Sequence, residues 1–361
     1  MTCLTQLLIQ HFRNLNVSID PCNGINVFYG KNGAGKTSIL EAVYFLGLGR
    51  SFRSNLIQRL IQNQADQFQI IAQIQQDHQT IPIGVERTKS GEKKIRIDGQ
   101  AASSIALLAK QLPLQLLTTE SHRYFHDGPS ARRQFLDWGL FHVEPDFYSL
   151  WQQFQRVLKQ RNAGLKNQLS IKEIEVWTQE LIKWSLQYNQ IRQGYVSQIE
   201  PVLNSLLKIV LPEFSLTLRY YRGWPEGKEL ALVLNQNQLR DQQLGYTQFG
   251  PQRADLQLYS GSTPVSDSLS QGQQKLAAYV LHLSQGILLQ KITGKNALYL
   301  IDDLPSELDK DKRAFIAQIL AQLKSQVFIT CIDPTEVSDI TSSIFPNSMF
   351  HVEHGGLILN S

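Results

Sequence analysis

The segment GKNGAGKT, residues 30–37, constrains the fold of this chain more than any other feature of its sequence. It matches the pattern G-x-x-x-x-G-K-[ST], which indicates a phosphate-binding loop when a strand precedes it and a helix follows it. Both are indicated here. Residues 25–29 are rich in β-forming side chains, and residues 36–48 are largely apolar, as in a helix buried against a sheet. We therefore predict an α/β fold built around a P-loop.

The chemistry of this loop follows from its residue types. Glycines at 30, 33 and 35 let the backbone curl so that its N–H groups point at phosphate oxygens, and the helix directs its positive end to the same place. Lys36 is expected to reach the β- and γ-phosphates, and Thr37 to offer its hydroxyl to Mg²⁺. The predicted ligands are therefore ATP and Mg²⁺. The expected ATP contacts of the loop are Gly30, Lys31, Asn32, Gly33, Ala34, Gly35, Lys36, Thr37 and Ser38.

A P-loop needs an acidic partner for the metal ion, and the segment ALYLIDD at 297–303 supplies one. Five residues of the buried-strand type lead to Asp302 and Asp303. Asp302 is predicted to complete the Mg²⁺ site, and Asp303 to orient or deprotonate the attacking water. A pair of acids after a strand can also cap a helix. The P-loop in the same chain favours the catalytic interpretation.

A third motif, LSQGQQK at 269–275, places a serine and a glycine in a turn that opens a helix. Such a helix start is a possible second anion site, although this signal is weak by itself. In the order P-loop, LSQGQQK and paired acids, the motifs resemble the ABC-type ATPase heads of the SMC and RecF group. The segment SELD at 306–309 would then be the D-loop.

Further segments resemble the RecF branch of this group, and the resemblance runs from Leu4 to about Pro334. These segments are HFRNL near the start, GRSFR at 49–53, GPSARRQFLDWGLFH at 128–142, LKQRN at 158–162 and GPQRADL at 250–256. The fold implied is an ABC-type P-loop ATPase head with an inserted, mostly helical lobe. We expect domain boundaries at 1–115 for the N-terminal part of the head, 116–245 for the lobe and 246–361 for the C-terminal part.

The resemblance also implies a mechanism and partners. In such heads the signature serine of one subunit contacts the γ-phosphate held by the P-loop of another. Ser270, with Gly272 and Gln273, would then bind ATP across a head-to-head homodimer. The catalytic residues implied are Lys36, Asp303 and Ser270. The activity implied is a weak, DNA-dependent ATPase that binds duplex DNA and single/double-strand junctions. With RecR and RecO, it would help to load RecA at gaps.

Some positions depart from the wider ABC pattern. Most ABC ATPases carry glutamate where this chain has Asp303, so hydrolysis is expected to be slow. No switch histidine follows the strand at 327–330, and Thr330 lies near its place. Gln115 and Gln111 are both candidates for the glutamine of the Q-loop.

Several basic residues have two interpretations each. Arg13 and Asn14 sit where related heads contact the nucleotide or its lid, and a surface role is the alternative. Arg50 and Arg53 would neutralise phosphates of ATP or DNA, or simply be solvated.

Two basic pairs belong to the middle of the chain: Arg132 with Arg133, and Lys159 with Arg161. Either pair is a candidate DNA contact. A solvated face is the alternative.

The middle of the chain reads as helical. Apolar residues recur at helical spacing over 146–164, and a second helix over 172–199 carries a heptad seam. With the turn at 162–171, the two predict a short antiparallel helical arm.

The composition limits the class of protein without identifying it. With 361 residues and 42% hydrophobic residues, the chain has enough apolar surface for two lobes. The net charge of +4 permits contact with a polyanion without requiring it. The three cysteines are scattered, and the N-terminus has neither a basic region nor a long apolar run. We expect a cytoplasmic protein without a membrane partner.

Three other functions would also use a P-loop. A transporter ATPase subunit is disfavoured because a whole helical lobe separates Lys36 from Ser270. A nuclease-associated ATPase is disfavoured because no second cluster of acids is visible. A structural head whose ATP only clamps the dimer, with negligible turnover, remains the main alternative.

Overall fold

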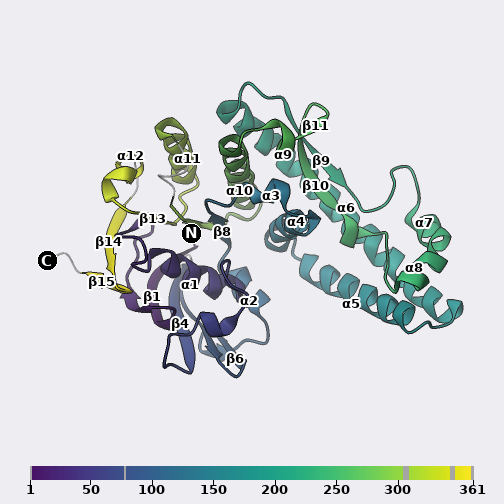
Figure 1. Ribbon diagram of the computed structural model, residues 1–361, viewed down its shortest axis with the longest axis horizontal. Helices are drawn as coiled ribbons and strands as arrows, with labels where there is room; N and C mark the ends of the chain where they lie inside the picture. Colours follow the sequence, from purple (N-terminus) through teal and green to yellow (C-terminus); the bar gives the residue numbers. More distant parts are fainter. Residues whose placement is uncertain (1, 77–78, 304–308, 342–345, 359–361) are drawn as a thin grey trace. The chain divides into compact units, whose positions relative to one another are not determined.

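Strand β3, Ile25–Tyr29, precedes the glycine-rich loop, and helix α1, Lys36–Leu48, which is labelled in Figure 1, follows it at the bounds that the sequence predicts. The computed structural model describes residues 2–76, 79–303, 309–341 and 346–358. The chain forms two units. The split unit comprises Met1–Ser121 and Lys275–Ser361, and the inserted unit comprises His122–Gln274.

The split unit contains a sheet in the order β15-β14-β3-β13-β12-β8, in which all neighbours are parallel except β14 and β15. Its remaining strands are β8 (Leu114–Leu117), β12 (Leu298–Ile301), β13 (Val327–Cys331), β14 (Asn347–Glu353) and β15 (Gly356–Ile358). Strand β12 is buried at every residue and β3 at four of five, as expected for the near-continuous apolar strands of a parallel sheet.

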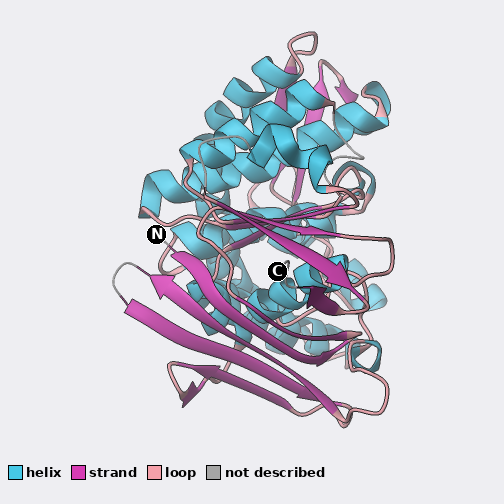
Figure 2. Cartoon of the chain, turned by 90° about the vertical axis from the view of Figure 1, so that its left-hand side faces the viewer, coloured by secondary structure: helices cyan, strands magenta, loops and turns pink. Residues whose placement is uncertain are grey.

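A second, antiparallel sheet of the split unit has the order β2-β1-β4-β5-β6-β7, and its long strands lie side by side in Figure 2. Its strands are β1 (Thr2–Phe12), β2 (Leu15–Ile19), β4 (Gln67–Gln76), β5 (Gln79–Thr88), β6 (Lys93–Ile97) and β7 (Gln100–Ala101). Turns at Ser90-Gly91 and Asp98-Gly99 join β5 to β6 and β6 to β7, and Asp98 and Gly99 have φ of 50° and 73°.

Helix α1 contacts strands of both sheets, which explains why it is apolar on nearly all sides. Phe45 of α1 meets Phe68 of β4 edge to face at 5.0 Å between ring centroids, and Phe68 meets Phe12 of β1 in the same way. Each such ring, once buried, contributes about 1.5–3 kcal/mol of transfer free energy. The packing of these rings therefore fixes the last turn of α1, the helix that follows the P-loop, against the antiparallel sheet.

The other helices of the split unit are α2 (Ile105–Gln111), α10 (Gln271–Thr293, which begins in the inserted unit), α11 (Lys310–Gln322) and α12 (Ser338–Thr341), with short 3₁₀ turns η1 (Ile57–Arg59) and η4 (Pro334–Val337). Across the described ranges, no helix is both long enough and apolar enough to span a bilayer.

The inserted unit carries the predicted helical arm, made of α5 (Phe147–Lys166) and α6 (Ile171–Val210). Ser170 and Glu173 form a capping box that starts α6. The helix runs eleven residues beyond the predicted end at 199 and passes through Pro201. Proline removes one helical hydrogen bond, but Leu203, Leu206 and Leu207 stay buried on the same seam, and this packing carries the helix onward.

The inserted unit also holds a sheet in the order β11-β10-β9. Its other elements are α3 (Arg123–His126), α4 (Pro129–Val143), β9 (Leu216–Tyr221), α7 (Leu230–Gln236), α8 (Gln238–Leu244), η2 (Pro251–Arg253), β10 (Asp255–Ser260), β11 (Thr263–Pro264) and α9 (Val265–Ser268). Because β10 pairs with β9, residues 246–274 group with the inserted unit, whereas we expected the lobe to end at 245.

Candidate nucleotide-binding site

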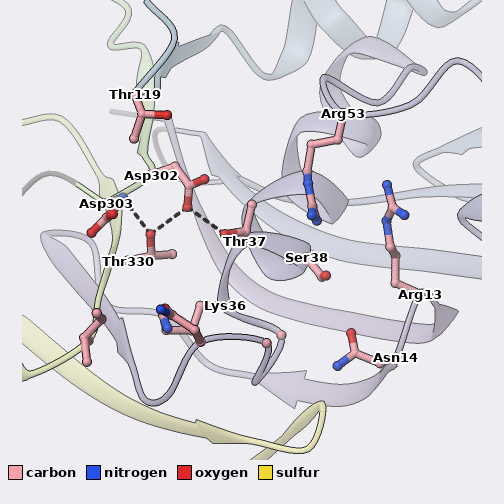
Figure 3. Close-up of a pocket in the computed structure, with 14 residues that line it drawn as sticks. Arg13, Asn14, Lys36, Thr37, Ser38, Arg53, Thr119, Asp302, Asp303 and Thr330 are labelled. Atoms are coloured by element: carbon pink, nitrogen blue, oxygen red, sulfur yellow. Dashed lines mark hydrogen bonds between the residues drawn. The ribbon is translucent and has the colours of Figure 1, made fainter. Parts of the chain in front are cut away.

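A pocket of about 560 Å³ lies in the split unit at the ends of β3, β12 and β13 (Figure 3). Most of the predicted site residues line it: Arg13, Asn14, Asn32, Gly33, Gly35, Lys36, Thr37, Ser38, Asp302 and Asp303. Gly30, Lys31 and Ala34 belong to the same loop without lining the pocket. The carboxyl ends of neighbouring parallel strands meet at one edge of a sheet, so segments far apart in sequence converge there.

The loop has the backbone that its glycines permit. Gly30 and Gly35 have φ of 142° and 117°, which side-chain-bearing residues rarely adopt. A Cβ at Gly30 would also lie 2.4 Å from the carbonyl oxygen of Val352, so no larger residue fits. The Lys36 ammonium donates to the carbonyls of Gly30 at 2.6 Å and Lys31 at 3.0 Å, which holds it over the loop. Burial lowers its pKa, partly offset by nearby acids including Asp303 and Asp302.

The two acids after β12 are held by hydroxyl groups. Thr37 Oγ1 donates to Asp302 Oδ1 at 2.9 Å, and Thr330 Oγ1 donates to the same oxygen at 2.7 Å. Thr330 in turn accepts the backbone N–H of Asp303 at 2.9 Å. Asp303 has a φ of 57°, an uncommon conformation for aspartate that this hydrogen bond supports. The residue near the expected switch position therefore ties both acids together.

This arrangement fits a magnesium ion. Its donors are the Thr37 hydroxyl and the Asp302 carboxylate, and Mg²⁺ prefers oxygen ligands. It usually takes one or two carboxylates together with phosphate oxygens and water, so a site with a single carboxylate is sufficient. Both donors line the pocket beside Lys36.

The opposite wall of the pocket is built around a buried acid. Arg13 donates from Nε and Nη2 to the two carboxylate oxygens of Glu41, at 2.7 Å each. Arg53 Nη1 lies 3.5 Å from the same carboxylate, and the Ser51 hydroxyl donates to it. Arg13 and Arg53 both line the pocket, so neither is merely a solvated surface residue. Their role toward a nucleotide stays a prediction.

The predicted signature serine starts a helix. Ser270 Oγ accepts the backbone N–H of Gln273 at 3.4 Å, and Gln273 Oε1 accepts the N–H of Ser270 at 2.8 Å. This is a capping box at the beginning of α10, and Ser270 and Gly272 are exposed there. Ser270, Gly272 and Gln273 belong to the inserted unit and do not line the pocket of their own chain. Their contact with ATP across a dimer stays a prediction.

Comparison with known proteins decides the family. The model for the RecF/RecN/SMC N terminal domain matches residues 3–353. The "DNA replication and repair protein RecF" of Coxiella burnetii (strain RSA 493 / Nine Mile phase I) is 49% identical over 357 residues, covering 98% of this chain and 99% of that protein. The protein of the same name from Shewanella frigidimarina is 44% identical, with 98% of each covered. The chain belongs to the RecF family.

Solved structures support the RecF-type fold. A structure described as the recombination mediator protein RecF with ATP in the RecFOR pathway has a TM-score of 0.87, covering 99% of this chain and 97% of that one, at 24% identity. The Smc head domain of Pyrococcus furiosus has a TM-score of 0.59 at 14% identity, with coverage of 99% and 95%. The predicted α/β, ABC-type ATPase head is therefore confirmed as the fold.

Neither candidate for the Q-loop glutamine of this RecF-family chain lines the pocket. Gln115 is 3% exposed, and its side chain is used within the core. Its Nε2 donates to Gln285 at 3.1 Å, and its Oε1 accepts from Nδ1 of His282 at 2.6 Å. Burial lowers the pKa of His282 to about 4, so this histidine is neutral near pH 7. Thr119, two residues beyond the end of β8, lines the pocket instead.

Of the two basic pairs predicted as DNA contacts or solvated residues, one member of each pair was predicted wrongly. Arg161 is 0% exposed and pairs with Asp241 at 2.8 Å, and Arg132 is 5% exposed and pairs with Asp255 at 2.6 Å. Neither arginine is exposed enough to contact DNA or to be solvated. The partners lie 80 and 123 residues away in sequence, so local spacing gave no sign of them.

The D-loop segment 306–309 lies outside the described residues except for Asp309, which caps α11 by accepting the N–H of Lys312 at 3.0 Å. Glu41 was missed, although a lone acid in an otherwise apolar helix was a visible signal.

Proposed function

We propose that this chain is an ATP-dependent DNA-binding protein of recombinational repair and replication that hydrolyses ATP slowly. The observation that supports this most is one pocket holding Lys36, Thr37, Asp302 and Asp303 together. The names of its relatives support the cellular process, because they are DNA replication and repair proteins.

The proposed chemistry assigns one task to each group. Lys36 and the loop N–H groups bind the phosphates, and Asp303 orients the attacking water and takes up its proton. A bound Mg²⁺, held by Thr37 and Asp302, would neutralise charge on the phosphate oxygens. An aspartate reaches less far than a glutamate, so the water is held less closely and turnover is slow.

The proposed assembly is a homodimer formed on ATP. Ser270, Gly272 and Gln273 of one subunit would contact the γ-phosphate bound by the other, and hydrolysis would release the pair. An exposed helix start is suited to this contact, because its free N–H groups attract anions. The dimer would grip duplex DNA and single/double-strand junctions and act with RecR and RecO to load RecA at gaps. The alternative is a structural head clamped by ATP, with negligible turnover.

The deciding experiment is ATP hydrolysis with Mg²⁺, alone and with duplex or gapped DNA, at several protein concentrations. A DNA-gated dimer should show a rate that rises with DNA and faster than linearly with protein. A rate indifferent to both would favour the structural clamp.

Replacing Asp303 with asparagine is expected to reduce turnover by about 100-fold or more, because the side chain keeps its shape but loses its capacity as a base. ATP binding should remain, and the dimer should accumulate. Single-turnover hydrolysis and light scattering measure the two effects. Asp311→Asn, an exposed acid in the first turn of α11, serves as the control. Unchanged turnover in Asp303→Asn would support the clamp.

Replacing Ser270 with alanine is expected to leave ATP binding by the monomer nearly intact and to weaken ATP-dependent dimerisation about tenfold or more, since a hydrogen bond to a charged group is lost. The helix also loses its cap, at a cost of about 1 kcal/mol, so thermal melting is measured alongside. The matched control is Ser268→Ala, which removes a nearby hydroxyl that donates to the carbonyl of Pro264. Normal dimerisation of Ser270→Ala would refute the sandwich.

Replacing Thr330 with valine keeps the shape of the side chain but removes both hydrogen bonds that link Asp302 and Asp303. We expect turnover to fall roughly 10- to 100-fold, since the bond to the Asp302 carboxylate alone contributes about 1.5–3 kcal/mol. Thr330→Ser should restore most of the rate. Steady-state kinetics over a Mg²⁺ titration would test this. A valine variant as fast as the parent would show that the link is dispensable.

A further inference from the structure

Glu41 is a fully buried carboxylate on the helix that follows the P-loop, and its side chain is 0% exposed. A buried charge is costly unless partners compensate it, and here the partners are specific. The bidentate contact with Arg13 has the fork geometry in which arginine binds carboxylates most strongly. Ser51 and Arg53 add to the same carboxylate from the loop after α1.

The Arg13 side chain is fixed from several directions. Its backbone has a φ of 56°, and its N–H donates to the carbonyl of Leu60 at 2.6 Å. Beyond the two bonds to Glu41, its Nη1 donates to the carbonyl of Arg59 at 3.2 Å. A guanidinium has five N–H groups, and these three bonds take up most of its edge. The two flat faces of the guanidinium therefore offer a ligand more surface than its N–H edge does.

Arg13 lies at the end of the pocket away from the acids. Figure 3 shows Lys36 and Asp303 on one side and Arg13 and Arg53 on the other, with Thr37 and Ser38 between them. Lys36 marks the place of the β- and γ-phosphates. The nucleoside is attached at the other end of the triphosphate, which is the Arg13 side.

We propose that Glu41 is a positioning residue that holds Arg13 so that a flat face of its guanidinium, rather than its N–H edge, meets the base of the bound nucleotide. Guanidinium planes stack on aromatic rings, whereas a lysine ammonium presents only a point charge. This inference rests on the proposed nucleotide binding and adds how the base is recognised.

The test compares two ligands, ATP and inorganic tripolyphosphate, both with Mg²⁺, by calorimetry. Arg13→Lys keeps the charge but removes the plane, and Glu41→Gln keeps the volume but releases the arginine. Each is expected to weaken ATP binding roughly tenfold, the typical loss of a stacked base contact, and to leave tripolyphosphate binding within about twofold. The double variant should be no weaker than either single one. Arg96→Lys, an exposed arginine on β6, is the control and should match the parent.

Three outcomes separate the possibilities. If Arg13→Lys binds ATP like the parent while Arg13→Ala loses both ligands, Arg13 acts as a phosphate charge and the inference is overturned. If Arg13→Lys and Glu41→Gln bind both ligands like the parent, the inference falls while nucleotide binding stands. A parent protein that binds neither ligand would overturn the proposed function as well. A melting curve is recorded for each variant. If Glu41→Gln does not fold, Glu41→Asp replaces it, because the shorter side chain moves the carboxylate away from Arg13.

Discussion

Replacing Lys36 with alanine should abolish tight ATP binding, with an affinity loss of at least about 100-fold. The ammonium is expected to bind two phosphates, and each such charge-assisted contact contributes about 1.5–3 kcal/mol. Lys36 is only 9% exposed, so the contacts of its ammonium are poorly screened by solvent. Calorimetric titration with ATP and Mg²⁺ measures the loss.

Lys110→Ala, which removes an exposed lysine from α2, is the control for this variant and should bind ATP normally. Lys36 also donates to the carbonyls of Gly30 and Lys31, so a melting curve is needed to show that the loop survives. Retained tight binding by a folded Lys36→Ala protein would contradict the assignment of this pocket to ATP.

Replacing Asp241 with alanine should destabilise the inserted unit by about 3–5 kcal/mol, because it leaves the guanidinium of Arg161 buried without its counter-charge. Both side chains are 0% exposed. Asp241 also accepts the backbone N–H and side-chain amide of Gln248, each at 3.1 Å, and these are lost as well. Urea unfolding followed by circular dichroism would measure the change.

The same pair offers a sharper comparison. Arg161→Met combined with Asp241→Leu removes both charges and should recover much of the lost stability, as apolar replacements of buried pairs often do. Lys94→Ala breaks the surface pair with Glu86, at 2.7 Å, and should change the stability far less than Asp241→Ala does, because solvent screens this pair. If Asp241→Ala were as mild as Lys94→Ala, the buried pair would contribute little.

The parts of the site that depend on local chemistry could be predicted from sequence. The loop at 30–37 and the acids at 302–303 follow strands whose type is visible in a few residues. Their convergence follows from the rule that parallel strands end at one edge. Lys36, Thr37 and Asp302 therefore came together as expected.

The parts that depend on distant partners could not be predicted. Arg161 and Arg132 look like surface charges in a local window, and only the tertiary fold supplies their acids. Gln115 was a candidate pocket residue by its place in the sequence, but its side chain hydrogen-bonds to His282 and Gln285, which are distant in sequence. The far end of α6 was missed because Pro201 suggests a stop, whereas burial of the leucines beyond it overrides that local preference.

The neighbours of β3 determine when the site can exist during protein synthesis. This strand carries the P-loop from residue 30 onward, yet it pairs on its two sides with β13 and β14, which begin at Val327 and Asn347. A growing chain on the ribosome has made the P-loop motif by residue 37, but both flanking strands are made only from Val327 onward. Until then, a nascent chain holds its P-loop on a strand that lacks both of these neighbours, so the site can form only after β13 and β14 have been made.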